Sequence, residues 1–217
     1  MSVKDDCGHH ENPRKKLYRR LLAFSVGLII LILFIILITW LILRPTKPHF
    51  TLQDVTVYAF NLSSPNLLTT TLQITLSTHN PNGKVGIYYD RLHVYASYHS
   101  QQITLPTLLP DTYQRQKDNT VWSPFVYGVA VPIPPYVAVN MNQDQSVGRV
   151  LVNVRVEGRV RWRVGTFVSG NYHLNVNCPA YIDDSGRKSI INNDNGLDHV
   201  ATAGVKYQLV MDCHVDV

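Results

Sequence analysis

The chain has 217 residues, of which 45% are hydrophobic, and its 20 Lys and Arg outnumber its 15 Asp and Glu by five. About half of that excess lies in the first 20 residues. The remaining chain is nearly neutral, so no nucleic-acid partner is expected. The length allows one ordinary domain beside a terminal segment.

An uninterrupted apolar run extends from residue 21 to residue 43 and contains neither a charged residue nor a proline. As a helix rising about 1.5 Å per residue it would be roughly 34 Å long, enough to cross a hydrocarbon core of about 30 Å. The alternative, a buried core helix, would keep a polar stripe. The run therefore predicts a single transmembrane helix over residues 21–43.

The two flanks of this run differ in charge. The basic residues near it are Arg14, Lys15, Lys16, Arg19 and Arg20 before it, and Arg44 and Lys47 after it. Basic flanks stay in the cytoplasm, which predicts a disordered cytoplasmic tail over residues 1–20 and an outside position for everything after a linker at residues 44–49. A cleaved signal peptide, the alternative, has a shorter apolar region of about 7–15 residues and a small-residue cleavage site. We therefore expect an uncleaved signal-anchor of type II.

This topology separates the three cysteines. Cys7 lies in the reducing cytoplasm and is expected to be a free thiol, with palmitoylation as the alternative. Cys178 and Cys213 lie outside, where disulfides persist, and two external cysteines allow one pairing. Each follows apolar residues in a period of two, so both are expected to face the domain interior. A disulfide between Cys178 and Cys213 is therefore expected, and two buried free thiols are the alternative.

From residue 50 the apolar period changes from helical to two, which is typical of β-strands. A first strand is expected near residues 52–59, with a slip at Asp54 that indicates a bulge. A second, over residues 70–78, alternates cleanly and so has one wet face. Between them, Asn61-Leu62-Ser63 is a sequon on the outer side, which predicts a glycan on Asn61.

The run Asn80-Pro81-Asn82-Gly83 interrupts this pattern. Proline lacks a donor and Asn-Gly supports positive φ, so the run predicts a tight turn. His79, beside it, is expected to be a hydrogen-bonded turn residue rather than a catalytic base.

Beyond the turn the alternation returns in six segments. Residues 100–120 are expected to be mostly loop, residues 136–145 a short helix, and residues 183–202, rich in Asn, Asp and Gly, a long exposed loop. The strands are expected over residues 85–89, 92–98, 121–132, 150–164, 174–178 and 205–213. About seven strands joined by turns predict a mainly β protein, with an antiparallel sandwich domain over residues 50–217.

Four arginines of the 150–164 segment share one strand phase and form what we call the arginine face, namely Arg155, Arg159, Arg161 and Arg163. Side chains on alternate strand positions project about 6.6–7 Å apart. Such a face is suited to pectin-like polyanions or lipid headgroups through charge-assisted hydrogen bonds. An ordinary wet strand face that discourages edge pairing is the favoured alternative.

No motif for catalysis or cofactor binding occurs in the sequence, which lacks a nucleophile elbow, a phosphate loop, a zinc signature and a dinucleotide fingerprint. The acidic residues Asp183, Asp184, Asp194 and Asp198 do not match the calcium-loop spacing, which favours a solvated loop. We therefore expect a protein that is not an enzyme and has no cofactor or metal.

One stretch resembles a known family. Residues 79–90, His-Asn-Pro-Asn-Gly-Lys-Val-Gly-Ile-Tyr-Tyr-Asp, are similar to the Asn-Pro-Asn and Ile-Tyr-Tyr-Asp signature of plant harpin-induced, non-race-specific-disease-resistance-like proteins. The layout of basic tail, single span, Tyr95-Ala96-Ser97-Tyr98, Val164-Gly165-Thr166-Phe167 and two late cysteines also matches, over essentially the whole chain. The outer part of these proteins is a late-embryogenesis-abundant type-two domain, associated with water stress and the hypersensitive response.

The resemblance implies a non-enzymatic, single-pass plasma-membrane protein of plants that acts in pathogen defence and stress. It also implies an outer domain similar to a fibronectin-type-III sandwich with one helix, and it places Cys178 and Cys213 on adjacent strands. The expected role is that of a membrane–wall or immune-complex interaction protein. A lipid- or wall-glycan-binding module, using the sandwich cleft or the arginine face, is the alternative.

The expected partners are the lipid bilayer, proteins of defence signalling, cell-wall polysaccharide and a second copy of the chain. One better-known family member carries an Asn-Gly-Asp adhesion triplet. This chain has Asn82-Gly83-Lys84 and Asn195-Gly196-Leu197 instead, so the resemblance does not imply wall adhesion by that route.

Overall fold

The computed structural model describes residues 13–43, 45–63, 65–183 and 204–217. They belong to two compact units, which divide between Arg44 and Pro45. Cys7 and most of the predicted acidic loop over residues 183–202 lie outside the described residues.

The first unit is the helix α1 (Pro13–Leu43). It begins eight residues before the predicted span, so residues 13–20, expected in the disordered tail, are helical. Proline suits the first turn of a helix because its missing N–H has no partner there, and Lys, Arg and Leu are good helix formers. Within α1 the stretch Leu17–Ile38 has a mean hydropathy of 3.3 and is long enough to cross a membrane. The helix is therefore compatible with a membrane anchor.

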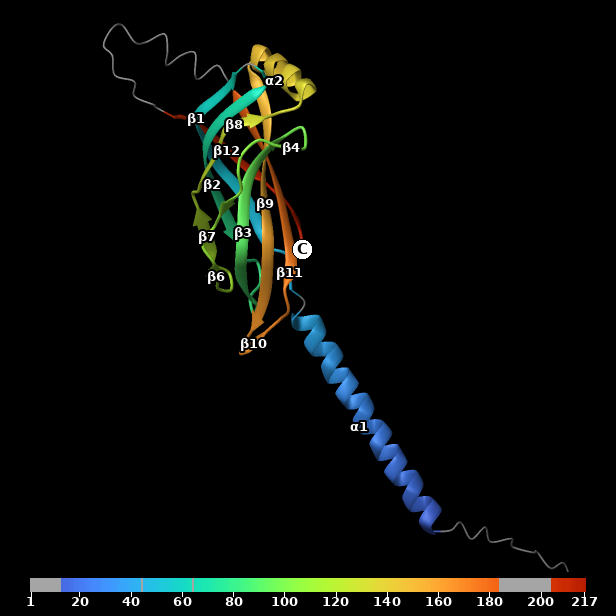
Figure 1. The fold of residues 1–217 in the computed structure, drawn as a ribbon. Helices are drawn as coiled ribbons and strands as arrows, with labels where there is room; N and C mark the ends of the chain where they lie inside the picture. The colour runs from blue at the N-terminus through green and yellow to red at the C-terminus, as the bar shows by residue number, and fades with distance from the viewer. Residues whose placement is uncertain (1–12, 44, 64, 184–203) are drawn as a thin grey trace, which may run out of the picture. The chain divides into compact units, whose positions relative to one another are not determined.

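The second unit is an antiparallel sandwich of two sheets, with α2 (Pro135–Val147) at one end and the β9–β10 hairpin at the other (Figure 1). One sheet contains β12 (Val205–Asp212), β1 (His49–Ser63), β2 (Leu67–His79), β7 (Asn119–Trp122) and β8 (Phe125–Pro132). The other contains β13 (His214–Asp216), β11 (Tyr172–Asp183), β9 (Arg149–Val164), β3 (Gly86–Tyr98), β4 (Gln101–Gln102), β5 (Thr107–Leu108), β6 (Thr112–Gln114) and β10 (Phe167–Val168). The predicted mainly β sandwich is therefore confirmed.

The core lies between the sheets because strand side chains alternate between two faces. Every second residue of β2 is buried, and Leu72, Ile74 and Leu76 have no exposed surface. Facing them, Val154 and Val156 of β9 are equally buried. The predicted bulge near Asp54 is present, since the register of β1 with both neighbours shifts between Leu52 and Asp54.

Three segments differ from the predictions. The expected loop over residues 100–120 contains β4, β5 and β6, short strands that pair with β3. The expected strand over residues 121–132 is two strands, because Pro124 has no N–H for the ladder. The last strand breaks at Cys213, where the chain leaves β12 in one sheet and enters β13 in the other.

The predicted short helix is confirmed as α2, two residues longer at its C-terminal end and one at its start. It buries Val137, Ala138 and Met141, and Gly148 ends it in the left-handed conformation at φ 86°. The Tyr98 hydroxyl donates to Asp144 of α2 at 2.7 Å and so ties the helix to β3.

Candidate functional site

The arginine face lies on the outer side of β9, as the alternation predicted. The even-numbered residues from Val150 to Val156 are buried, whereas the four arginines point away from the core. Two strands flank β9 in register, with β3 on one side and β11 on the other. Their outward side chains therefore decide what each arginine meets.

Two of the arginines are held by neighbours, and we call them the held half. Arg161 donates through Nε and Nη2 to the two carboxylate oxygens of Asp90, at 2.5 and 3.0 Å, and its guanidinium lies 5.2 Å from the Tyr88 ring centroid. The hydrogen bonds to Asp90 and its charge raise the pKa of Arg161 further. Arg163 donates to the Tyr88 hydroxyl at 2.9 Å and lies 5.3 Å from the Tyr113 ring centroid.

The other two arginines, Arg155 and Arg159, form the open half. The Arg159 guanidinium is exposed and makes no hydrogen bond or ion pair within the described ranges. Near Arg155, the Tyr95 hydroxyl donates to Glu157 at 2.5 Å. Burial, and then the hydrogen bond to Glu157 and its charge, raise the pKa of Tyr95 to about 12, while the charge of Arg155 opposes that shift.

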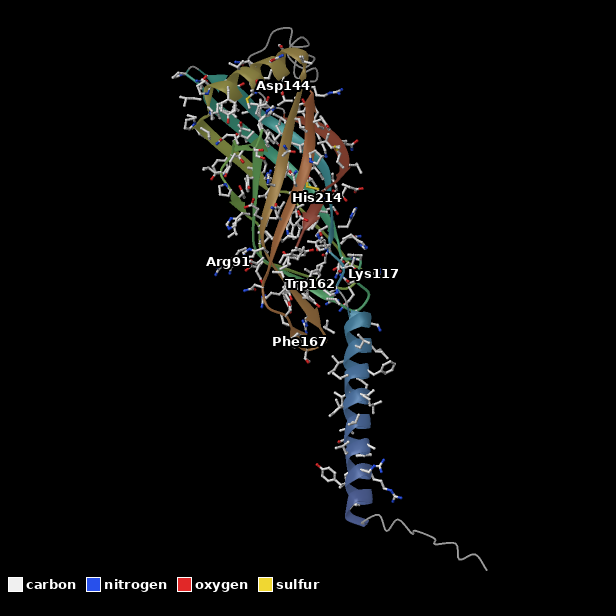
Figure 2. The ribbon with its side chains drawn as sticks, turned by 90° about the vertical axis from the view of Figure 1, so that its right-hand side faces the viewer. Arg91, Lys117, Asp144, Trp162, Phe167 and His214 are labelled. Carbon is white, nitrogen blue, oxygen red and sulfur yellow. A yellow bond between two sulfur atoms is a disulfide. The ribbon has the colours of Figure 1, made fainter. Side chains whose placement is uncertain are left out.

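A bulge in β3 adds a further cation beside Arg159. The register of β3 with β9 shifts between Asp90 and His93, and Arg91 adopts a positive φ of 51°. The bulged backbone comes so close to Gly158 that a Cβ there would lie 2.7 Å from the Arg91 carbonyl oxygen. In a regular strand, one of two consecutive side chains would face the core. The bulge leaves both Asp90 and Arg91 outside it. Figure 2 shows Arg91 at the surface of the domain.

A hollow of about 580 Å³ lies over this bulge, and we call it the central hollow. Its lining residues come from β3, β9 and β11, namely Arg91, His93, Glu157, Gly158, Arg159, His173, Leu174 and Asn175. A second hollow of about 330 Å³ shares Arg91 and Arg159 with it and also contains Asp111 and Asn171. The two hollows therefore adjoin each other on the outer face of the sheet.

Of the residues that line the central hollow, Arg159 was predicted from the sequence as a candidate site residue. Arg91, His93 and His173 were not, because strand pairing brings them together from separate segments. One signal was available in the sequence. The buried hydrophobic residues of this segment are odd-numbered up to Tyr89 and even-numbered from Leu92, and such a change of phase indicates a bulge.

The predicted Asn-Pro-Asn turn is a buried clasp. Asn80 is fully buried, and its side-chain nitrogen donates to the carbonyls of Val85 and Arg115 at 2.8 and 2.9 Å. Asn82 exchanges two 2.8 Å hydrogen bonds with the backbone of Thr46, one as donor and one as acceptor. The motif therefore fixes the start of the domain and the connection after β6 to the same turn. His79 contacts Asn119 at 2.7 Å, as expected of a hydrogen-bonded residue.

Cys178 and Cys213 form a disulfide with a Cα–Cα distance of 4.4 Å, visible in yellow near His214 in Figure 2. Cys178 lies on β11 and is fully buried, and Cys213 is half-buried where the chain crosses between the sheets. The bond therefore fastens that crossing. Asn61 of the predicted sequon is exposed near the end of β1.

No group of three His, Cys, Asp or Glu suited to a metal ion occurs in the part of the chain that the structure describes. Between the sheets, a cavity of about 20 Å³ adjoins Phe60 and Val150. Ligand pockets usually measure about 300–1,000 Å³, so this cavity is too small for a sterol or an acyl chain.

Comparison with known proteins identifies close relatives. The late embryogenesis abundant protein family, LEA_2, matches residues 75–179. NDR1/HIN1-like protein 1 of Arabidopsis thaliana is 52% identical over 98% of this chain and 99% of its own length. NDR1/HIN1-like protein 12 of the same plant is 49% identical over the full length of both chains. A solution structure of a late embryogenesis abundant protein matches over 81% of this chain and 94% of its own, at 12% identity and a TM-score of 0.32.

Proposed function

The chain belongs to the NDR1/HIN1-like late embryogenesis abundant protein family, and from this premise we propose that it is a membrane-anchored interaction protein of plant defence and stress responses. The observation that carries the proposal is the extent of the match. The alignment, at 52% identity, covers 98% of the chain and so includes both the apolar helix and the sandwich domain. The relatives therefore share the combination of anchor and domain.

The proposed topology is single-pass type II in the plasma membrane, with the N-terminus cytoplasmic and the domain outside. The excess of basic residues before the apolar run supports this orientation. So does the Cys178–Cys213 disulfide, because such bonds persist in oxidising compartments. An exposed Asn61 is also accessible to glycosylation in the secretory pathway.

The proposed action is binding without catalysis. The domain would link membrane and wall or hold immune partners, either defence-signalling proteins or a second copy of the chain. The long strands and the disulfide provide a rigid support for exposed side chains. Such rigidity favours recognition, since fewer side chains and loops must be ordered on binding.

Protease protection of sealed vesicles from plant cells, with the cytoplasmic face of the membrane outward, tests the topology. The C-terminal domain should be shielded from the protease. In gel electrophoresis, Asn61→Gln should remove one glycan mobility step. Replacing the basic residues before the helix by neutral ones, with basic residues added after Leu43, should invert or scramble insertion. A wild-type C-terminus that is digested from the cytoplasmic side would contradict the proposal.

The second candidate function is a lipid- or wall-glycan-binding extracellular module. The 20 Å³ cavity argues against a lipid between the described parts of the sheets. The central hollow, in contrast, favours an anionic ligand on the outer face, because it combines an accessible volume with arginines. These observations support a wall glycan on the outer face rather than a lipid between the sheets.

A further inference from the structure

We propose that the central hollow binds an acidic sugar of a polysaccharide and that Arg159 and Arg91 recognise its carboxylate. The inference deepens the proposed function by naming a ligand class for the domain. It rests on the proposed function in one respect, namely that the domain lies on the outer side of the membrane.

The first step is the availability of the two arginines. Asp90 stands opposite Arg159 in the strand register, yet both of its carboxylate oxygens accept hydrogen bonds from Arg161. The Arg159 and Arg91 guanidinium groups have no hydrogen-bond or ion-pair partner among the residues that the structure describes. A guanidinium presents a planar fork of donors that matches a carboxylate. Two such forks therefore face the same hollow.

The second step is the size of the site. The central hollow measures about 580 Å³, within the range of small-ligand sites. The second hollow, about 330 Å³, continues from it through the shared Arg91 and Arg159. Adjoining hollows with shared cations accommodate successive units of a charged chain better than one isolated ion.

The third step is the set of acceptors inside the hollow. Glu157 accepts from Tyr95 through one carboxylate oxygen, and its other oxygen has no partner within the described part of the chain. The side-chain amide of Asn175 lies in the same lining. A carboxylate repels an anionic group placed against it, phosphate or uronate alike, but it accepts hydrogen bonds from sugar hydroxyls. A ligand with one carboxylate and several hydroxyls, a hexuronate, satisfies both kinds of group.

The fourth step is the charge around the site. Three arginines, Arg91, Arg159 and Arg161, face three carboxylates, Asp90, Asp111 and Glu157. These charges balance, and the Tyr95 phenol stays neutral. Asp90 is already paired with Arg161, so Arg91 and Arg159 remain for the ligand carboxylate. His93 on β3 and His173 on β11 also line the hollow, and their ring nitrogens are hydrogen-bond partners for sugar hydroxyls.

The test is calorimetric titration of the full chain in nanodiscs of zwitterionic lipid with an α-1,4-linked galacturonate oligomer, at low salt. Arg159→Gln should weaken binding at pH 5.5 by about tenfold or more, the loss of a charge-assisted contact. Arg155→Gln is the matched control, because it removes the same charge from the same strand face outside the hollow. It should change the affinity by less than about threefold.

Further arms separate the sources of anionic charge. The methyl-esterified oligomer and a neutral glucose oligomer should not bind, and inorganic phosphate should compete weakly. Unchanged thermal midpoints of all variants would exclude misfolding as the cause.

Several outcomes would overturn the inference. They are no binding of galacturonate, equal losses for Arg159→Gln and Arg155→Gln, equal binding of the methyl ester, or phosphate as effective as the oligomer. The outcome of the topology assay is independent of the outcome of this titration. A domain on the cytoplasmic side would remove the proposed function, whereas absent binding by an outside domain would remove only the inference.

Discussion

The held and open halves of the arginine face lie on one strand, in one alternating phase, and yet differ in what their charges do. Arg161 and Arg163 contact Asp90, Tyr88 and Tyr113, so their guanidinium groups are part of the fold. Arg159 contacts no partner of that kind among the described residues and borders a hollow instead. The difference comes from the neighbouring strand, where the β3 bulge ends the regular pairing at Asp90.

This comparison shows that a row of like residues is not one functional unit. Where β3 supplies a carboxylate and aromatic rings, arginine stabilises the sheet. Where the bulge inserts Arg91 instead, two cations remain for an external anion. The variants below test this division, beginning with the support common to both halves.

The largest expected effect comes from Cys213→Ser, which should destabilise the whole domain and with it both halves of the arginine face. The disulfide closes a separation of 35 residues, and the loop-entropy relation gives about 3–4 kcal/mol of stabilisation. Thermal denaturation of the full chain under oxidising and reducing conditions measures it. Cys178→Ser should cost nothing more once Cys213 is replaced. An unchanged midpoint in Cys213→Ser would show that the bond does not support the sheets.

Asn80→Ala should have the next largest effect, about 2–4 kcal/mol of unfolding free energy, because it leaves buried backbone carbonyls without donors. Denaturant unfolding measures the loss. Asn119→Ala, at an exposed neighbouring hydrogen bond, is the control and should cost less than about 1 kcal/mol. Similar losses for both would contradict the clasp.

The division of the face itself is tested by Arg161→Gln and Arg159→Gln. Arg161→Gln breaks the paired contact with Asp90 and should lower the thermal midpoint by about 2 °C, whereas Arg159→Gln should leave it within about 1 °C. In a double-mutant cycle, Asp90 should couple to Arg161 and not to Arg159. Equal coupling energies for Asp90–Arg161 and Asp90–Arg159 would show that the held and open halves do not differ.

The smallest effect concerns alkaline pH and the Tyr95–Glu157 contact. Burial first, and then the hydrogen bond to Glu157 and its charge, raise the pKa of Tyr95 from 10 to about 12. The contribution of the neutral phenol to stability is therefore fully present below pH 10 and is lost as the pH rises through 12. Tyr95→Phe should therefore be slightly less stable than the wild type at pH 8 and equal to it near pH 12. Unfolding midpoints at both pH values check this. A difference that grows with pH would contradict the assigned contact.

The sequence predicted the elements with long, regular patterns. The apolar run, the alternating 150–164 strand and the period-two placement of both late cysteines rest on local periodicity, and the structure agrees with them. The start of α1 at Pro13 was missed because the charged flank, read as a tail, also favours helix. The break at Cys213 was missed because two strands in different sheets can share one alternation.

The candidate site was predicted only in part. Alternation identified the four arginines as one outward row, but it carries no information about their cross-strand partners. Asp90, Arg91 and His173 reach Arg159 or its neighbours through pairing of β3 and β11 with β9, which depends on the whole topology. The phase change between Tyr89 and Leu92 was the local trace of the bulge that divides the face.

The most direct measurement is nuclear magnetic resonance of the arginine side chains during titration of the full chain in nanodiscs with the galacturonate oligomer at pH 5.5. The account predicts that the Nε–H signals of Arg91 and Arg159 shift in proportion to bound ligand. Those of Arg161 and Arg163, already held by Asp90 and Tyr88, should stay in place. Equal shifts of Arg155, Arg159, Arg161 and Arg163, the whole arginine face, would contradict the account. So would shifts confined to Arg161 and Arg163.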